Sequence, residues 1–255
     1  MKILTLNLHC FAEESIDKNQ KIIANYISDN NIDVVLLQEV AQPIDGELIK
    51  GNIKKGNYAH TLQSLLKNMF ANYNLTYDFG NKAFNIYDEG LAILSRESFV
   101  EEKSFYVSSK VDYEDWHTRI IVSAKIKVDG EVFNFTTTHL GWTDGEEKFE
   151  EQFDKLLSNL DMTETHIIAG DFNVSQDSKE YQYIVSKGLN DVYFNNEKRY
   201  FNDVTHLPYI DVKKEASRID YIFSNKEYRV NNIRIAFKNK RVSDHFGVFM
   251  EITKK

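Results

Sequence analysis

The sequence predicts an α/β protein in which two packed mixed β-sheets carry helices on their outer faces. Segments with the period-two alternation of strands outnumber segments with helical spacing. Local hairpins occur beside helical crossovers, and the helices are too few to cover a fully parallel sheet, so mixed sheets are expected. Because the 255 residues contain no Pro/Gly/Ser-rich linker and no internal repeat, we expect a single domain over residues 1–255.

Charge and composition limit the classes of function. The chain has 31 basic and 39 acidic side chains, a net charge of −8, and is 42% hydrophobic, which excludes disordered, collagen-like and coiled-coil classes. The acidic total argues against a general binder of phosphate backbones, but residues 211–255 hold 11 basic and 6 acidic side chains and keep that question open. Cys10 is the single cysteine, and no apolar run approaches a membrane span. We therefore expect a cytoplasmic protein without a membrane partner.

The first part of the chain opens with a strand–helix–strand unit. Leu4, Leu6 and Leu8 alternate with polar residues, as in a strand with one buried and one polar face, which places Asn7 on a polar face or in a site. In chain order the expected elements are a strand at residues 4–8, a helix around 22–27, a strand at 32–37, a helix at 58–70, and short strands at 75–79 and 90–94.

The rest of the chain is strand-rich, with one further helix. Two alternating runs, at residues 119–128 and 131–139, are joined through Asp129-Gly130, and such a pair is a strong hairpin signal. Apolar side chains at helical spacing predict a helix at residues 146–160. The remaining expected strands lie at residues 165–169, 219–223, 230–237 and 246–252.

Polar residues recur where these apolar strands end. Any one of them is more often a turn former or a cap than a ligand. If they converge on the same edge of one sandwich, turn chemistry alone does not explain them. These residues are Asn7, Glu39, His139, Asp171 with Asn173, Asp220, and Asp244 with His245.

The order and spelling of the motifs around these residues resemble one known family. The motifs are Leu37-Gln38-Glu39, residues 89–95, Thr138-His139-Leu140, Gly170-Asp171-Phe172-Asn173 and Ser243-Asp244-His245. From Asn7 to His245 the chain resembles the endonuclease/exonuclease/phosphatase superfamily of metal-dependent phosphoesterases. The resemblance implies a four-layered α/β/β/α sandwich, in agreement with the pattern of elements.

Hydrolysis of a phosphoester requires a water in line with phosphorus and relief of charge on the phosphoryl oxygens. Mg²⁺ prefers oxygen ligands and keeps several waters, and the scattered His residues and lone Cys show no zinc spacing. By resemblance, Glu39 binds Mg²⁺, or Mn²⁺ as an alternative, while Asn7 and Asp244 complete the metal shell directly or through water. Asp171 would orient or deprotonate the attacking water, and Asn173 would donate to a phosphate oxygen.

The resemblance also assigns two histidines. His245 would donate to the phosphate with Asp220 as its carboxylate partner, and His139 would bind the phosphate from the other side or protonate the leaving group. Glu89 could orient His139, although a solvated loop acid is an equal alternative. Arg119 is a candidate clamp for phosphate or substrate, unless it simply faces water.

Trp142 could line a substrate pocket, or it could be a surface aromatic in a loop. Cys10 is expected to be a buried small residue, because no general base accompanies it. The histidines left without a role are His9, His60, His117, His166 and His206.

Substrate choice depends on loops. The segments expected to rim the site carry many acids, which would repel an extended polyanion and admit a small phosphorylated molecule. Residues 87–94 and 139–143 are similar to bacterial members that dephosphorylate sugar phosphates such as maltose 6'-phosphate. The alternatives are a nuclease that uses the basic residues 211–255, a less favoured sphingomyelinase, and a catalytically silent binding module. The sequence does not indicate an oligomeric state, nor which residues read the leaving group.

Overall fold

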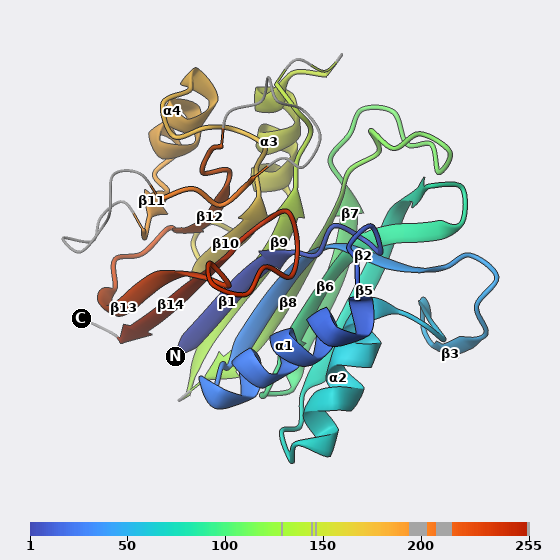
Figure 1. Cartoon of the computed structure of the whole chain (residues 1–255). Coiled ribbons are helices and arrows are strands. Elements are labelled where there is room, and N and C mark those ends of the chain that lie inside the picture. Colours follow the sequence, from blue (N-terminus) through green and yellow to red (C-terminus); the bar gives the residue numbers. More distant parts are fainter. Residues whose placement is uncertain (129, 144, 146, 194–202, 208–215, 254–255) are drawn as a thin grey trace.

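The computed structural model describes residues 1–128, 130–143, 145, 147–193, 203–207 and 216–253 (Figure 1). Its strands form two six-stranded sheets and one small hairpin. Sheet I contains β1 (Lys2–Asn7), β2 (Val34–Pro43), β5 (Asn74–Ala83), β6 (Tyr87–Ser95), β13 (Arg229–Ala236) and β14 (Gly247–Thr253). Sheet II contains β7 (Phe99–Tyr106), β8 (Ile120–Val128), β9 (Glu131–His139), β10 (His166–Asp171), β11 (Asn190–Asp191) and β12 (Asp220–Ser224). The small hairpin is β3 (Leu48–Lys50) with β4 (Ile53–Lys54).

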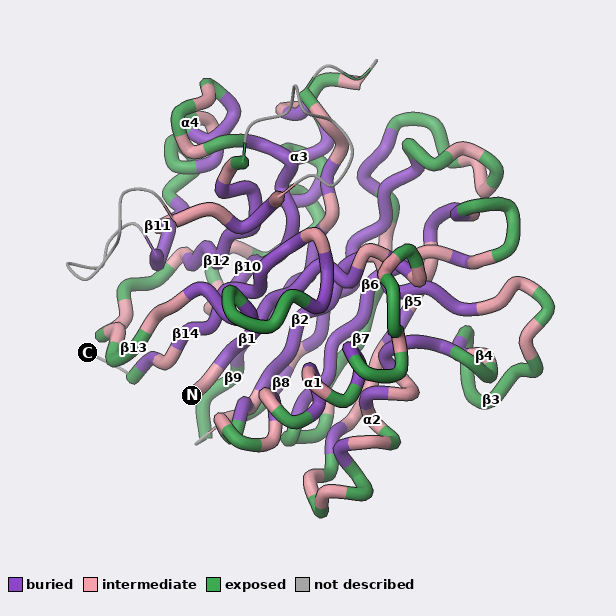
Figure 2. Tube along the Cα trace, in the orientation of Figure 1, coloured by how far each residue is buried: buried purple, intermediate pink, exposed green. Residues whose placement is uncertain are grey.

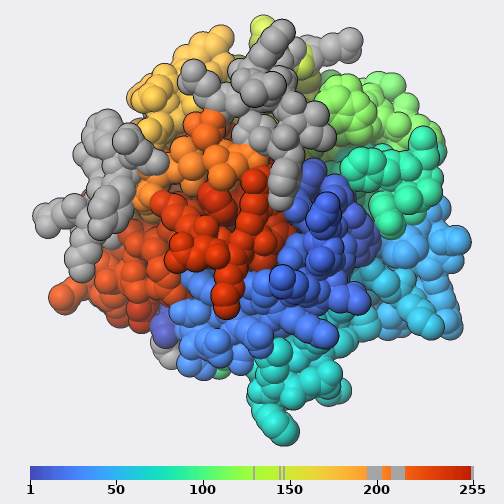
Figure 3. All heavy atoms as spheres, viewed as in Figure 1, coloured from blue at the N-terminus to red at the C-terminus, as the bar shows by residue number. Residues whose placement is uncertain are grey.

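Both large sheets are mixed. The strand order is β13-β14-β1-β2-β6-β5 in sheet I and β11-β12-β10-β9-β8-β7 in sheet II. In each sheet one parallel pair, β1 with β2 or β9 with β10, is flanked by antiparallel neighbours. The C-terminal strand β14 pairs with β1, so the two ends of the chain meet inside sheet I. On the surface, red atoms of the C-terminal part also lie beside blue atoms of the N-terminal part (Figure 3).

In the described part of the chain, four helices complete the outer layers. They are α1 (Ile16–Asp29), α2 (Tyr58–Asn68), α3 (Phe149–Ser158) and α4 (Lys179–Ser186). α1 and α2 cover the outer face of sheet I, where Ile23 and Leu62 pack in one cluster with Leu6. α3 and α4 cover sheet II in a second cluster that includes Phe153 and Ile184.

A third hydrophobic cluster lies between the sheets and includes Ile3, Leu36, Phe135 and Ile167. The three clusters join four layers, which are the first helix pair, sheet I, sheet II and the second helix pair, and this confirms the predicted α/β/β/α sandwich. Figure 2 shows that the buried segments run along the central strands. Because β1 lies inside sheet I and is covered by sheet II, the face of β1 predicted to be polar is buried too, with Thr5 and Asn7 at 0% exposure.

The expected elements are present, together with five that the sequence did not predict, which are the short strands β3, β4 and β11, the edge strand β7 and the helix α4. β7 is an edge strand with mostly exposed side chains, so it lacks a clear alternation, and α4 is only 8 residues long. The predicted hairpin is β8–β9, in which Val128 pairs with Glu131; Asp129 lies outside the described residues. The helix expected from residue 146 begins at Phe149, and residue 146 is also outside the described part of the chain.

The register of the central strands positions the polar residues. His139, Asp171 and Asp220 lie opposite one another on β9, β10 and β12. In sheet I, Asn7 at the end of β1 pairs with Gln38 of β2. The ends of these strands therefore bring side chains from both sheets to one edge of the sandwich.

Below this edge, a small polar layer separates the apolar core from the candidate site. Gln38 Nε2 donates to Thr137 Oγ1 across the sheets at 2.8 Å and contacts Thr5 Oγ1 at 3.1 Å. All three residues are fully buried and hydrogen-bonded to one another, so the interior changes from apolar to polar towards the strand ends. Among the described residues, no helix is long and apolar enough to cross a membrane.

Candidate active site

Glu39 enters the site from a bulge in β2. The pairing of β2 with β6 shifts between Leu37 and Val40, and Glu39 has a φ of 48° in the left-handed region. A bulge re-aims a side chain that regular pairing would fix, and strained backbone of this kind clusters at functional sites. Asn7 Nδ2 donates to Glu39 Oε1 at 2.8 Å and to Asp171 Oδ2 at 3.1 Å. The two sheets are thus joined through Asn7.

Asp171 lies at the centre of the cluster, with 1% of its surface exposed. Its Oδ2 is 3.7 Å from His139 Nε2 and 3.6 Å from His245 Nε2. The backbone N–H of Asn173 donates to Asp171 Oδ1 at 2.9 Å. Burial raises the pKa of Asp171 above its usual range, although the charge of His245 opposes this shift.

His245 is held by Asp220, whose Oδ2 lies 2.9 Å from His245 Nδ1. Burial by itself would lower the pKa of His245, but the charges of Asp220 and Asp171 outweigh it and raise the pKa to about 10. The backbone N–H of Asp220 donates to Thr205 Oγ1 at 3.1 Å. The predicted pair of carboxylate and imidazole is therefore present, with Nδ1 as the donor and Nε2 turned towards Asp171.

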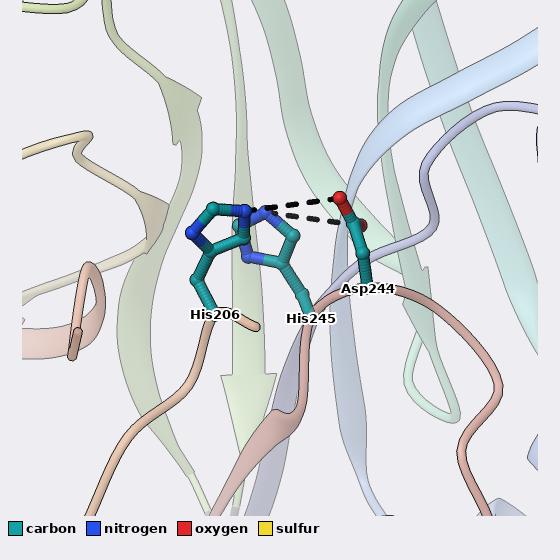
Figure 4. Close-up of side chains that lie close together, drawn as sticks. All are labelled: His206, Asp244 and His245. Carbon is teal, nitrogen blue, oxygen red and sulfur yellow. Dashed lines mark ion pairs between the residues drawn. The ribbon is translucent and has the colours of Figure 1, made fainter. Parts of the chain in front are cut away.

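Asp244 joins the cluster through His245, and a histidine without an assigned role lies beside it. His206 Nε2 is 3.8 Å and His245 Nε2 is 4.0 Å from oxygens of Asp244, and both imidazoles point towards that carboxylate in Figure 4. His9 Nδ1 is 3.5 Å from Asp244 Oδ1. His206 reaches this place through an isolated bridge to His245, for which the sequence carries no periodic signal.

Glu89 lies close to Glu39, with Cys10 in contact with both carboxylates. The thiol of Cys10 is 3.5 Å from Glu89 Oε2 and 3.8 Å from Glu39 Oε2. The pKa of Cys10 is raised well above its usual range, mainly by burial and also by the negative charges of Glu89 and Glu39. The thiol is therefore neutral, which disfavours a role as a nucleophile. In the described part of the chain no hydrogen bond joins Glu89 to His139, and their pairing remains a prediction.

Asn173 has a φ of 53° directly after the central strand. Its Nδ2 donates to the carbonyl of Leu140 at 2.8 Å, which fixes the amide in the site. Its Oδ1 is buried without a hydrogen-bond partner. One N–H of the amide remains available to an incoming acceptor.

Arg119 and Trp142, the two predicted substrate contacts, line one cavity of about 540 Å³. Arg119 is 4% exposed and its Nε has no hydrogen-bond partner. Arg119 also interacts electrostatically with the cluster. The pKa of His139 is lowered mainly by burial, and the positive charge of Arg119 is the second cause. Trp142 lies with its ring centroid 6.4 Å from that of His206.

The donor set suits a hard divalent cation. Glu39, His139 and Asp171 each offer a ligand atom, and these atoms lie within 4.8 Å of one another. The carboxylates are crowded, because ligand atoms of Glu39, Glu89 and Cys10 also lie within 4.8 Å of one another. Burial, and after it the charge of Glu39, raises the pKa of Glu89 accordingly. A bound cation would relieve that repulsion, and carboxylate and amide oxygens are the ligands that Mg²⁺ prefers.

The fold and the cluster define a class of protein, and comparison with known families gives the same one. The model of the Endonuclease/Exonuclease/phosphatase family matches residues 4–245. The chain belongs to this family of metal-dependent hydrolases.

Individual relatives extend the comparison. An endonuclease/exonuclease/phosphatase family protein from Leptotrichia buccalis C-1013-b is 32% identical, with a TM-score of 0.92 and 99% of each chain covered. The mannosyl-6-phosphatase Bt3783 of Bacteroides thetaiotaomicron VPI-5482 shares the fold with a TM-score of 0.71 at 22% identity, over 99% of each chain. Sphingomyelinase C 2 of Leptospira interrogans is 24% identical over 249 residues, 89% of this chain; the match spans only 38% of that protein's length.

Proposed function

We propose that this protein is a Mg²⁺-dependent phosphatase that hydrolyses a phosphate monoester of a small molecule by in-line attack of water. The foremost class of substrate is a sugar phosphate such as maltose 6'-phosphate, in the carbohydrate metabolism of the cytoplasm. One observation carries the proposal: the buried carboxylate of Asp171 lies between the Nε2 atoms of His139 and His245, at 3.7 and 3.6 Å. A carboxylate between two imidazoles can hold a water by a hydrogen bond while the N–H groups of both rings donate to a phosphate.

The cation would be held by Glu39, with Asn7 and Asp244 completing its surroundings. When bound, Mg²⁺ or Mn²⁺ supplies positive charge that neutralises the phosphoryl oxygens. Asn7 donates from Nδ2 to Glu39 Oε1, and Asp244 Oδ1 lies 4.0 Å from His245 Nε2. The side-chain oxygen of Asn7 accepts from the backbone N–H of His9, so Asn7 would reach a cation through a bound water. Mg²⁺ keeps several waters and needs only one or two carboxylates beside the substrate phosphate, which suits this arrangement.

The protein's own groups divide the remaining work. Asp171 orients the attacking water and accepts its proton, while Asn173 donates to a non-bridging oxygen. His245, kept charged by Asp220, donates from Nε2 to the phosphate. His139 Nε2 lies 3.7 Å from Asp171 Oδ2, and we assign to it the protonation of the leaving oxygen. Burial and the nearby positive charges lower the pKa of His139 in the free protein, so the ring must take up a proton when the anionic phosphate binds, because that negative charge favours the protonated ring.

The charge around the site favours a small substrate. The cavity beside the cluster carries Asp115, Glu147 and Glu151 on its wall, together with Lys110 and Arg119. Lys110 Nζ is already 3.0 Å from Asp112 Oδ2, so its charge is largely offset. A second phosphate of a nucleic-acid strand would be repelled by these carboxylates, whereas a single phosphate at Arg119 would not. The mannosyl-6-phosphatase that shares this fold supports a sugar phosphate as the substrate.

A substrate panel tests this proposal. With Mg²⁺ present, we expect release of inorganic phosphate from maltose 6'-phosphate or mannose 6-phosphate, measured beside cleavage of plasmid DNA and of an abasic oligonucleotide. Steady nicking of DNA without release of phosphate from any monoester would replace the phosphatase by a nuclease. The same panel with the Asp171→Asn protein identifies any contaminating activity.

A further inference from the structure

We propose that the cavity beside Arg119 is the site that recognises the leaving group, and that Trp116 and Trp142 bind this group as a neutral sugar ring. The cavity wall comes from the segment before β8, from the turn after β9 and from α3. Its volume of about 540 Å³ falls in the ordinary range for small-molecule sites. This assignment rests on the proposed function, because it places the phosphate at Arg119 and the rest of the substrate in the cavity.

Arg119 links the cavity to the catalytic cluster. Its side chain is 4% exposed, and its Nε carries a buried N–H without a partner. A buried donor without a partner costs free energy unless a ligand satisfies it. Arg119 directly precedes β8, in which Ile121 pairs with Thr138, the residue before His139. A phosphate bound by Arg119 would therefore lie within reach of both the cluster and the cavity.

The cavity is held open by hydrogen bonds within its own wall. Glu147 accepts from the backbone N–H of Ser109 at 2.7 Å and from Gln152 Nε2 at 2.9 Å. Gln152 Oε1 in turn accepts from the N–H of Gly141 at 2.9 Å. A Cβ at Gly141 would lie 3.1 Å from Gln152 Nε2, so only glycine lets the two segments approach this closely without displacing Gln152. The site is therefore preorganised without a ligand.

The aromatic wall suits a sugar. Trp116 is 55% exposed, and together with Trp142 it gives the cavity an aromatic wall that a ligand can cover. Its ring packs against His117, with centroids 3.7 Å apart, and His117 Nδ1 lies 2.6 Å from Asp115 Oδ1. The indole face is apolar and electronegative, so it packs well against the C–H face of a sugar ring.

The polar wall points to the same class of ligand. Asp115, Glu147 and Glu151 present carboxylates that accept hydrogen bonds from hydroxyl groups. A neutral ring with many hydroxyls satisfies both walls. A nucleobase would also stack on tryptophan, but it offers few hydroxyls, and a strand would bring further phosphates towards the acids.

The chain itself provides a direct probe of the cavity. Its two tryptophans, Trp116 and Trp142, both line the cavity, so all intrinsic tryptophan fluorescence reports on this site. We expect maltose or mannose, added without phosphate or metal, to change the emission saturably. Adenosine and cytidine, in matched titrations corrected for their absorbance, should change it far less. No saturable response to either sugar, or a saturable response to the nucleosides alone, would overturn the assignment.

Kinetics give the second readout. For Trp116→Ala and Trp142→Ala, we expect kcat/KM for the sugar phosphate, relative to that for methyl phosphate, to fall about tenfold. Phe70→Ala removes an aromatic that is 97% exposed and does not line the cavity, and it should leave the ratio unchanged. An unchanged ratio in both tryptophan variants would contradict the inference. If no monoester is hydrolysed, the proposed function fails, and the fluorescence titration still decides whether the cavity binds sugars.

Discussion

His245 Nδ1 lies 2.9 Å from Asp220 Oδ2, and this contact joins the two sheets of the sandwich at the candidate site. Asp220 begins β12 in sheet II, and His245 lies two residues before β14 in sheet I. The N–H at Nδ1 donates to this carboxylate and fixes the orientation of the ring, so Nε2 faces Asp171 Oδ2 at 3.6 Å. The orientation of His245 therefore depends on how the two sheets pack.

Replacing this carboxylate should affect catalysis more than binding. In Asp220→Asn the imidazole loses its neighbouring charge, and we expect kcat to fall about 100-fold, because the charged form of His245 is no longer favoured. KM should change little. Steady-state kinetics with a sugar phosphate measure both parameters, and Asp154→Asn, at an exposed position on α3, is the matched control. Equal losses in the two variants would show that the Asp220–His245 contact has no specific role.

Asp171→Asn should separate catalysis from folding. We expect a loss of at least about 1,000-fold in kcat, since the amide cannot accept a proton. Because burial disfavours the ionised carboxylate of Asp171, the neutral amide should not lower Tm in metal-free buffer by more than about 4 °C. Thermal unfolding followed by circular dichroism measures this. A much larger drop would mean that Asp171 is needed for the fold itself.

Removal of the cation should abolish activity and lower stability together. Chelation with EDTA is expected to stop phosphate release, and added Mg²⁺ should restore it and raise Tm, because a ligand that binds only the folded state stabilises it. Glu39→Gln should lose most of the Tm response to Mg²⁺, whereas Glu150→Gln, on α3, should keep it. Full activity in excess EDTA would rule out the metal mechanism.

Position 170, the first of the motif Gly170-Asp171-Phe172-Asn173, accepts only glycine. Its φ is 145°, and a Cβ there would lie 2.0 Å from the backbone oxygen of Thr138. We expect Gly170→Ala to reduce the free energy of unfolding by more than about 3 kcal/mol, because backbone must move. Gly188→Ala, also at positive φ but with open space around its Cβ, should cost only about 1 kcal/mol. Urea denaturation of both variants tests the difference, and similar losses would contradict this explanation.

The sequence predicts the layers, and it predicts which strand ends carry the candidate site residues, because both depend on local patterns. Alternation identifies β1, β8 and β9, and a strand end is visible wherever an apolar run stops at a polar residue. Once β9 and β10 are parallel neighbours, their register places His139 beside Asp171 without further information. The family motifs and the fold were therefore predictable from the chain alone.

What the sequence does not predict depends on contacts between distant segments. The bulge that turns Glu39 into the site has no local signal, and neither does the bridge that brings His206 to His245. Glu89 and Glu39 both contact the thiol of Cys10, because β6, which carries Glu89, lies beside β2, which carries Glu39. The single polar face expected for β1 is buried, since whether a polar face meets water or another sheet is decided by packing.

The most direct test of the account is the rate at which inorganic phosphate leaves mannose 6-phosphate in the presence of Mg²⁺, measured for the wild-type protein and for Asp171→Asn. We expect steady, EDTA-sensitive release by the wild type and almost none by the variant, in which the group between His139 and His245 is an amide. Release at equal rates by both proteins would contradict the role of Asp171. No release by either, with maltose 6'-phosphate also inert, would contradict the assignment as a sugar phosphatase.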